Sequence, residues 1–152
     1  MREEVYDYLY DYGFSSKDLD NILDGNEEMF FTNLIDVKKH ISFLEEKGLE
    51  SKDIINVINS NPFMLTDREV RFDYLDNIYY KELEIDDKSL KQLIINNPRT
   101  YSINPAKLRE IINYFKKLNY GKKEIREFIL KNHKVIEMDL ETFKNSLIKS
   151  NI

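Results

Sequence analysis

The sequence predicts an all-α fold, an α-solenoid of about four two-helix repeats, and two observations carry this prediction. An apolar triplet at positions x, x+3 and x+4 recurs four times, at spacings of 35, 36 and 35 residues, and an asparagine stands at x+7 in every copy. A period of this length indicates one supersecondary unit copied in line, unable to bury its apolar face without its neighbours. The triplets are Leu19/Ile22/Leu23, Ile54/Val57/Ile58, Leu90/Leu93/Ile94 and Ile125/Phe128/Ile129, and the asparagines are Asn26, Asn61, Asn97 and Asn132.

Each unit is expected to hold two helices and a short turn. The first helix has apolar residues at i, i+4 and i+7, as in Val37, Ile41 and Leu44, and the second helix carries the triplet. A helix near residues 3–12 opens the chain and one near 139–150 closes it. The prediction is a single helical-repeat domain, 1–152, with units at roughly 1–33, 34–66, 67–103 and 104–138 and a terminal capping helix at 139–152.

Boundary signals agree with this register. Ser15, with Asp18 three residues later, and Ser51 are predicted N-caps, because a serine hydroxyl can accept a bond from the first turn of the helix. Between the first and second helices a residue with a permissive backbone is expected. The third unit also carries the extra residue that lengthens its spacing, so its turn is expected to differ. The residues at the four junctions are Gly13, Gly48, Glu84 and Asn119.

The asparagine ladder is predicted to start the short turns. Asparagine is a favoured N-cap, and proline is favoured at the first helical position, where its missing N–H costs nothing. Pro62 and Pro98 directly follow Asn61 and Asn97. Each second helix is therefore expected to end at the asparagine, with a short helical turn beginning there.

Composition restricts the function and the location. The chain has 152 residues, of which 41% are apolar and 34% charged, so it is neither disordered nor membrane-spanning by composition. It has no cysteine, which excludes disulfides and thiolate sites. The N-terminal segment is acidic and unlike a secretory or transit peptide, so we expect a cytoplasmic protein. Charge is uneven, since residues 1–97 carry 11 basic and 22 acidic side chains and residues 98–152 carry 12 and 6.

The repeat resembles that of the mitochondrial transcription termination factor family, the mTERF repeat. The segment 57–65 is similar to the proline-containing part of that repeat, and the segment 43–49 is similar to its helix-to-glycine turn, ending at Gly48. This resemblance implies a curved, right-handed α-solenoid that binds nucleic acid along a basic concave path. The chain departs from the family in being shorter and acidic overall, with a net charge of −5.

A basic segment in the last repeat is the candidate nucleic-acid site. Phosphate binding needs several cations on one accessible path, and Tyr114 and Tyr120 nearby can stack on bases. Glu124 and Glu127 interrupt the segment, so a solvated helix face is the alternative interpretation. The predicted phosphate-binding residues are Lys116, Lys117, Lys122, Lys123, Arg126, Lys131 and Lys134.

The acidic, tyrosine-rich start of the chain is a second candidate surface. Tyr6, Tyr8, Asp7 and Asp11 suit a protein interface, where tyrosine is enriched, or belong to the cap that an end repeat needs. The favoured function is a regulatory nucleic-acid-binding module with DNA or RNA as partner. The alternative is a protein-interaction module, an inhibitor, adaptor or nucleic-acid mimic, that grips a basic protein.

No set of residues predicts catalysis. His40 and Asp76 occupy core positions of adjacent first helices, where they can pair, mark an exposed groove, or serve the structure alone. With two histidines and no cysteine the sequence offers no metal cluster, and its four scattered glycines form no phosphate-cradling loop. We therefore expect no enzyme activity, no cofactor, no metal, no membrane contact and no small-molecule substrate.

Overall fold

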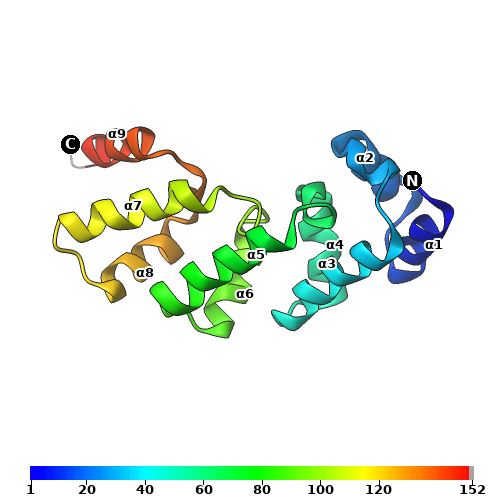
Figure 1. The fold of residues 1–152 in the computed structure, drawn as a ribbon, viewed down its shortest axis with the longest axis horizontal. Coiled ribbons are helices and arrows are strands. Elements are labelled where there is room, and N and C mark those ends of the chain that lie inside the picture. Colours follow the sequence, from blue (N-terminus) through cyan, green and yellow to red (C-terminus); the bar gives the residue numbers. More distant parts are fainter. Residues whose placement is uncertain (151–152) are drawn as a thin grey trace. The chain divides into compact units, whose positions relative to one another are not determined.

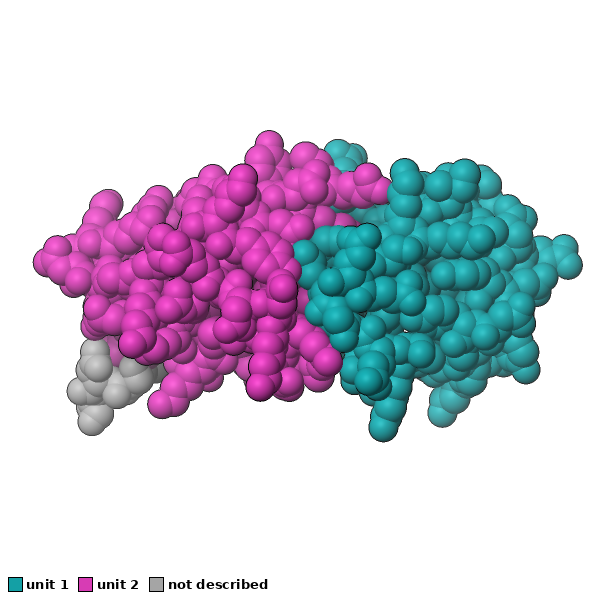
Figure 2. Space-filling model, turned by 90° about the horizontal axis from the view of Figure 1, so that it is seen from below, with its two compact units in different colours: residues 1–68 teal, residues 69–152 magenta. Residues whose placement is uncertain are grey.

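The computed structural model describes residues 1–150, and over this range the chain is all-α, with nine α-helices and no strand. The predicted fold class is confirmed. The chain divides into two compact units, residues 1–68 and 69–152, which Figure 2 shows in different colours.

The first unit contains two copies of a helix–helix–turn repeat (Figure 1, blue to green). Its elements are α1 (Glu3–Tyr12), α2 (Ser16–Gly25), the 3-10 turn η1 (Glu27–Phe30), α3 (Leu34–Glu46), α4 (Ser51–Ser60) and the 3-10 turn η2 (Pro62–Leu65). α1 packs on α3 and α2 packs on α4. First helices therefore stack on first helices and second helices on second helices, as a tandem repeat requires.

The second unit continues the pattern (Figure 1, green to red). Its elements are α5 (Glu69–Asp76), the π-helical segment η3 (Asn77–Glu82), α6 (Asp87–Asn96), α7 (Pro105–Lys117), α8 (Lys122–Lys131), the 3-10 turn η4 (His133–Glu137) and α9 (Leu140–Ser150). α5 packs on α7 and α7 packs on α9, so the first helices again lie side by side.

The junctions between first and second helices adopt the expected backbone. Gly13 and Gly48 have φ angles of 129° and 90°, and Glu84 and Asn119 have φ angles of 52° and 67°. Among residues 1–150 these are the four positions with positive φ. The left-handed conformation is easy for glycine and accessible to asparagine, and it is unusual for glutamate.

The third repeat absorbs its extra residue in a π-helical segment. α5 passes directly into η3, and the amide of Leu83 donates to the carbonyl of Ile78, five residues earlier. Such a bond encloses one residue more than an α-helical bond, so the segment takes up an insertion without leaving the helix axis. The expected irregularity of this repeat is confirmed.

The apolar triplets form the core. Ten of their twelve side chains are buried, and the half-buried exceptions are Leu23 and Phe128. At the helix starts, Ser15 forms a capping box with Asp18, through bonds of 3.0 and 2.9 Å. The predicted cap at Ser51 is wrong, because Ser51 is already helical and Glu50 precedes the helix without a side-chain cap.

Two asparagines of the ladder, Asn26 and Asn97, join successive repeats, and of the predicted caps the one at Asn97 forms, because its Oδ1 accepts a 3.0 Å bond from the Arg99 amide. The Asn26 amide donates to the Pro62 carbonyl at 3.1 Å and to Thr66 Oγ1 at 2.7 Å. The Asn97 amide donates to the His133 carbonyl at 3.2 Å, and its Nδ2 also lies 3.2 Å from Glu137 Oε2. Both asparagines thus reach residues 36 and 40 positions ahead, in the turn of the next repeat. The turns do start at these asparagines, but Asn26, Asn61 and Asn132 form no side-chain cap there.

His40 and Asp76 serve the structure, each inside its own unit. The ring nitrogens of buried His40 lie 2.5 and 2.6 Å from the carbonyl oxygens of Asp36 and Asp67, which ties α3 to the segment after η2. Asp76 accepts a 2.6 Å bond from the Tyr101 hydroxyl. Of the interpretations that the sequence left open, the structural one is supported.

Candidate nucleic-acid interface

The basic segment lies on the α7–α8 hairpin. Lys116 and Lys117 end α7, where positive charge is favourable at the carboxyl end of the helix dipole. Lys122 and Lys123 begin α8, where positive charge is unfavourable. Glu124 offsets that cost, because its carboxylate accepts a 3.2 Å bond from the Gly121 amide. The four lysines therefore flank the short loop between the two helices.

Three of the seven predicted cations are used inside the fold. Lys122 forms a 3.2 Å ion pair with Glu84, and Lys123 lies 4.0 Å from Glu127. Arg126 donates to the carbonyl oxygens of Leu83 and Glu84 at 3.0 and 3.4 Å. Arg126 and Lys122 therefore attach α8 to the junction of the preceding repeat.

The other four cations face solvent. Lys116, Lys117, Lys131 and Lys134 are exposed, and none forms an ion pair with any residue that the structure describes. Lys116 and Lys117 lie at the end of α7, across the short loop from the start of α8, whereas Lys131 and Lys134 lie at the end of α8 and in the following turn η4. At 1.5 Å per residue, the start and end of this helix are about 14 Å apart. The hairpin thus presents two positive points, not one continuous patch.

The two nearby tyrosines differ in access. Tyr114 is half-buried, with its ring edge-on to Phe143 and the Lys144 ammonium 4.8 Å from its centroid. Tyr120 packs edge-on against Phe115 and keeps 45% of its surface exposed. Tyr120 is therefore the better placed of the two to stack on an unpaired base.

Sequence reasoning missed Lys144, which lies far along the chain from the basic segment. The repeat alignment could have identified it, because Lys144 and Tyr114 occupy the same repeat positions as Lys38 and Tyr8. Lys38 stands over the Tyr8 ring at 5.3 Å, just as Lys144 stands over Tyr114 at 4.8 Å. Both pairs have the same separation, and they are three repeat periods apart.

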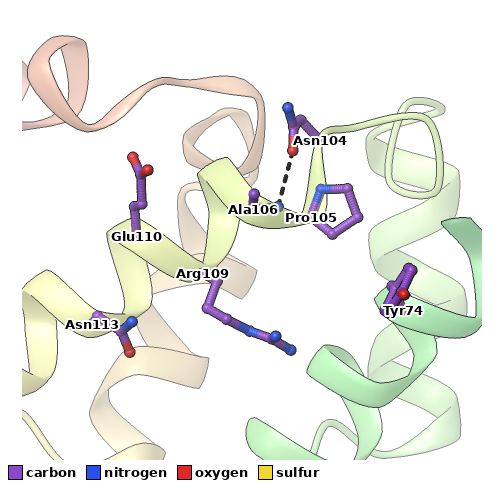
Figure 3. Close-up of a pocket in the computed structure, with 7 residues that line it drawn as sticks. All are labelled: Tyr74, Asn104, Pro105, Ala106, Arg109, Glu110 and Asn113. Atoms are coloured by element: carbon purple, nitrogen blue, oxygen red, sulfur yellow. Dashed lines mark hydrogen bonds between the residues drawn. The ribbon is translucent and has the colours of Figure 1, made fainter.

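A surface pocket of about 460 Å³ lies between α5 and the start of α7. Figure 3 shows Tyr74 on one side, and Arg109 extending from α7 on the other. Arg109 is the cation among the described lining residues, and it is paired with Glu82 at 2.8 Å. The pocket is therefore a weaker anion site than the ends of α8. Its lining residues are Tyr74, Asn104, Pro105, Ala106, Arg109, Glu110 and Asn113.

The N-terminal candidate surface lies on α1. Tyr6 is half-buried, stacks on Tyr10 with ring centroids 6.3 Å apart, and donates a 3.3 Å bond to Ser16. Tyr8 is half-buried on another side of the helix, and burial, followed by the charge of Glu45, raises its pKa. The two carboxylates, Asp7 and Asp11, are fully accessible to a partner.

Fold and surface together define an all-α helical-repeat protein whose basic side chains gather on its last complete repeat. The sequence model of the mTERF family matches residues 3–151, so the chain belongs to the mTERF family. Proteins of this family are typically nucleic-acid-binding helical-repeat proteins and are generally not enzymes. A comparison with curated proteins gives no significant match.

Within the described part of the chain, no helix is long and apolar enough to cross a membrane. Over the same residues, no three histidine or carboxylate side chains gather as ligands for a metal ion.

Proposed function

We propose that this protein binds nucleic acid through the phosphate backbone, with the lysines near the two ends of α8 as its contacts. One observation carries the proposal: four exposed lysines of α7, α8 and the following turn η4 form no ion pair within the described structure. Cations already paired with carboxylates release fewer counterions when they meet a phosphate than unpaired cations do. The contact residues are Lys116, Lys117, Lys131 and Lys134.

Lys122, Lys123 and Arg126 have a supporting role in this proposal. Lys122 and Arg126 hold α8 against the preceding junction and so fix the positions of the exposed lysines, and Lys123 pairs with Glu127 along α8 itself. Phosphate contacts set the register of a protein on nucleic acid and carry little sequence information. We therefore expect weak sequence preference, with Tyr120 favouring single strands if it stacks on a base.

Salt-dependent binding tests the proposal. Fluorescence anisotropy would follow labelled single-stranded and duplex DNA and RNA between about 50 and about 200 mM salt. Four phosphate contacts predict a slope of log K against log salt of about −3.6 on duplex DNA, or about a 150-fold loss of affinity over this range. No binding to any of the four probes at low salt would refute the proposal.

The acidic first unit supports the second candidate function, binding of a basic protein. Residues 1–68 carry 7 basic and 15 acidic side chains, and Asp7 and Asp11 are exposed on α1. The negative electrostatic potential of such a surface steers a basic partner toward it and speeds their association. In a pull-down, we expect a basic protein to be retained by the wild-type chain and released by the Asp7→Lys/Asp11→Lys variant. Retention by that variant would refute this alternative.

A further inference from the structure

One core position of the repeat, Phe128, is partly exposed on a face of the second unit between α8 and α9. Phe128 is the fourth copy of a triplet position whose other members, Ile22, Val57 and Leu93, have at most 2% of their surface exposed. Phe128 is only half-buried. Its ring packs against Phe115 and Phe143, with centroids 5.0 and 6.1 Å away, and the rest of its surface is open.

Other apolar side chains surround Phe128 on the same face. A groove of about 700 Å³ runs along α8 and α9, and Phe128 lies in its lining with Leu118, Tyr120 and Ile148. Ile148 is 61% exposed, and Leu118 and Tyr120 are 46% and 45% exposed. These apolar side chains lie in the same lining as charged residues of α8.

The asparagine ladder is also incomplete here. Asn26 and Asn97 are 2% and 4% exposed and donate to the next turn, whereas Asn132 is exposed and donates back to the Phe128 carbonyl of its own helix at 3.0 Å. Beside it, the buried Nδ1 atom of His133 has no hydrogen-bond partner in the described structure. Asn132, which lines the groove, therefore lacks the following turn that covers Asn26 and Asn97.

The groove carries charges of both signs along α8, so a second copy of the same stripe can be complementary to it. Glu124, Glu127, Phe128 and Lys131 all line it, and their spacing places them in one stripe along α8. If a second α8 lies antiparallel on this stripe, with the two-fold axis between positions 127 and 128, Glu124 of each copy faces Lys131 of the other. An interface in which residue i meets j and j meets i is what a two-fold symmetric dimer requires.

We propose that this face is the interface of a symmetric dimer of this chain, built from the α8 stripe and Ile148 of α9. A second copy supplies opposite charges for Glu124 and Lys131, and its approach removes Phe128 and Ile148 from solvent. A nucleic acid fits the groove less well, because its phosphates would meet Glu124 and Glu127. The interface leaves the phosphate contacts Lys116, Lys117 and Lys134 outside the groove lining, whereas Lys131 and Tyr120 belong to it, so dimerisation competes with nucleic acid for these two side chains.

Sedimentation equilibrium of the full chain, with its charge-reversed variants, tests the proposal. We expect the wild-type chain to show a monomer–dimer equilibrium. Glu124→Lys and Lys131→Glu each turn two attractive pairs into repulsive ones. The dimer dissociation constant of each variant alone should therefore rise by at least about tenfold. An equimolar mixture of the two restores both attractions and should recover the wild-type dimer. Glu110→Lys, an equivalent reversal on an exposed face of α7, is the matched control and should leave the equilibrium unchanged.

A wild-type chain that stays monomeric at all accessible concentrations would overturn the proposal. So would a dimer that survives the single reversals, or a mixture that fails to recover it, since either result places the contact elsewhere. Circular dichroism checks that each variant is folded. If loss of the bond from the Gly121 amide prevents Glu124→Lys from folding, Ile148→Asp takes its place and should be folded and monomeric.

Discussion

The hydrogen bonds of Asn97 contribute more to the free energy of unfolding than those of Asn132, which occupies the same position in the next repeat. Asn97 is 4% exposed, donates to the His133 carbonyl, and accepts a 3.0 Å bond from the Arg99 amide. Asn97→Ala removes these bonds and leaves the groups at His133 and Arg99 without their partner. One lost bond costs about 1 kcal/mol, and a buried group left without a partner costs about 1–3 kcal/mol. We therefore expect Asn97→Ala to lower the free energy of unfolding by about 2–4 kcal/mol.

Asn132→Ala is the matched control. Its amide is exposed and bonds only to its own helix, so we expect a loss below about 0.5 kcal/mol. Asn97→Asp adds a second comparison, since aspartate has the same shape and cannot donate to the His133 carbonyl when ionised. It would also bring a second carboxylate close to Glu137, whose Oε2 lies 3.2 Å from the Asn97 amide.

Urea denaturation followed by circular dichroism measures the three variants. For a chain of this size, about 3 kcal/mol corresponds to a fall in Tm of roughly 6–12 °C. Equal effects of Asn97→Ala and Asn132→Ala would refute the reasoning, because the two differ mainly in whether they reach the turn of a following repeat.

Three further predictions concern the core, the hairpin and pH. Leu44→Ala, at a fully buried position of α3, should cost about 2–5 kcal/mol in urea denaturation, and a loss below about 1 kcal/mol would contradict the assigned register. Arg126→Ala should cost about 1–3 kcal/mol and leave the salt slope of nucleic-acid binding almost unchanged, because its guanidinium bonds the Leu83 carbonyl. Burial, helped by the charge of Glu45, raises the pKa of Tyr12 to about 12, above its unfolded value of about 10. The folded state therefore favours the protonated phenol of Tyr12. Its stability relative to the unfolded chain is fully present below pH 10 and falls as the pH rises toward 12. The urea midpoint should fall in this window, and it should fall less in Tyr12→Phe.

The repeat could be predicted from sequence because its signals are local and periodic. The triplets and the junction residues depend on the helical period and on the backbone conformation of single residues. Glu84 is an example, since it aligns with Gly13 and Gly48 in the repeat and adopts the positive φ that they have.

The partners of polar side chains could not be predicted in the same way. An asparagine before a turn reads as a cap, and only the stacking of repeats shows that Asn26 reaches the Pro62 carbonyl instead. A run of lysines likewise gives no sign of which members meet a carboxylate. Glu84, which pairs with Lys122, lies 38 residues away from it in the sequence.

The salt slope of nucleic-acid binding by two sets of lysine variants tests the central claim most directly. Replacing Lys116, Lys117, Lys131 and Lys134 by glutamine should bring the slope on duplex DNA from about −3.6 close to zero, at protein concentrations low enough to keep the chain monomeric. Replacing Lys122 and Lys123, which are paired in the fold, should change it by much less. If the fourfold variant keeps the wild-type slope, or if the paired lysines prove to carry it, the assignment of the phosphate contacts is wrong.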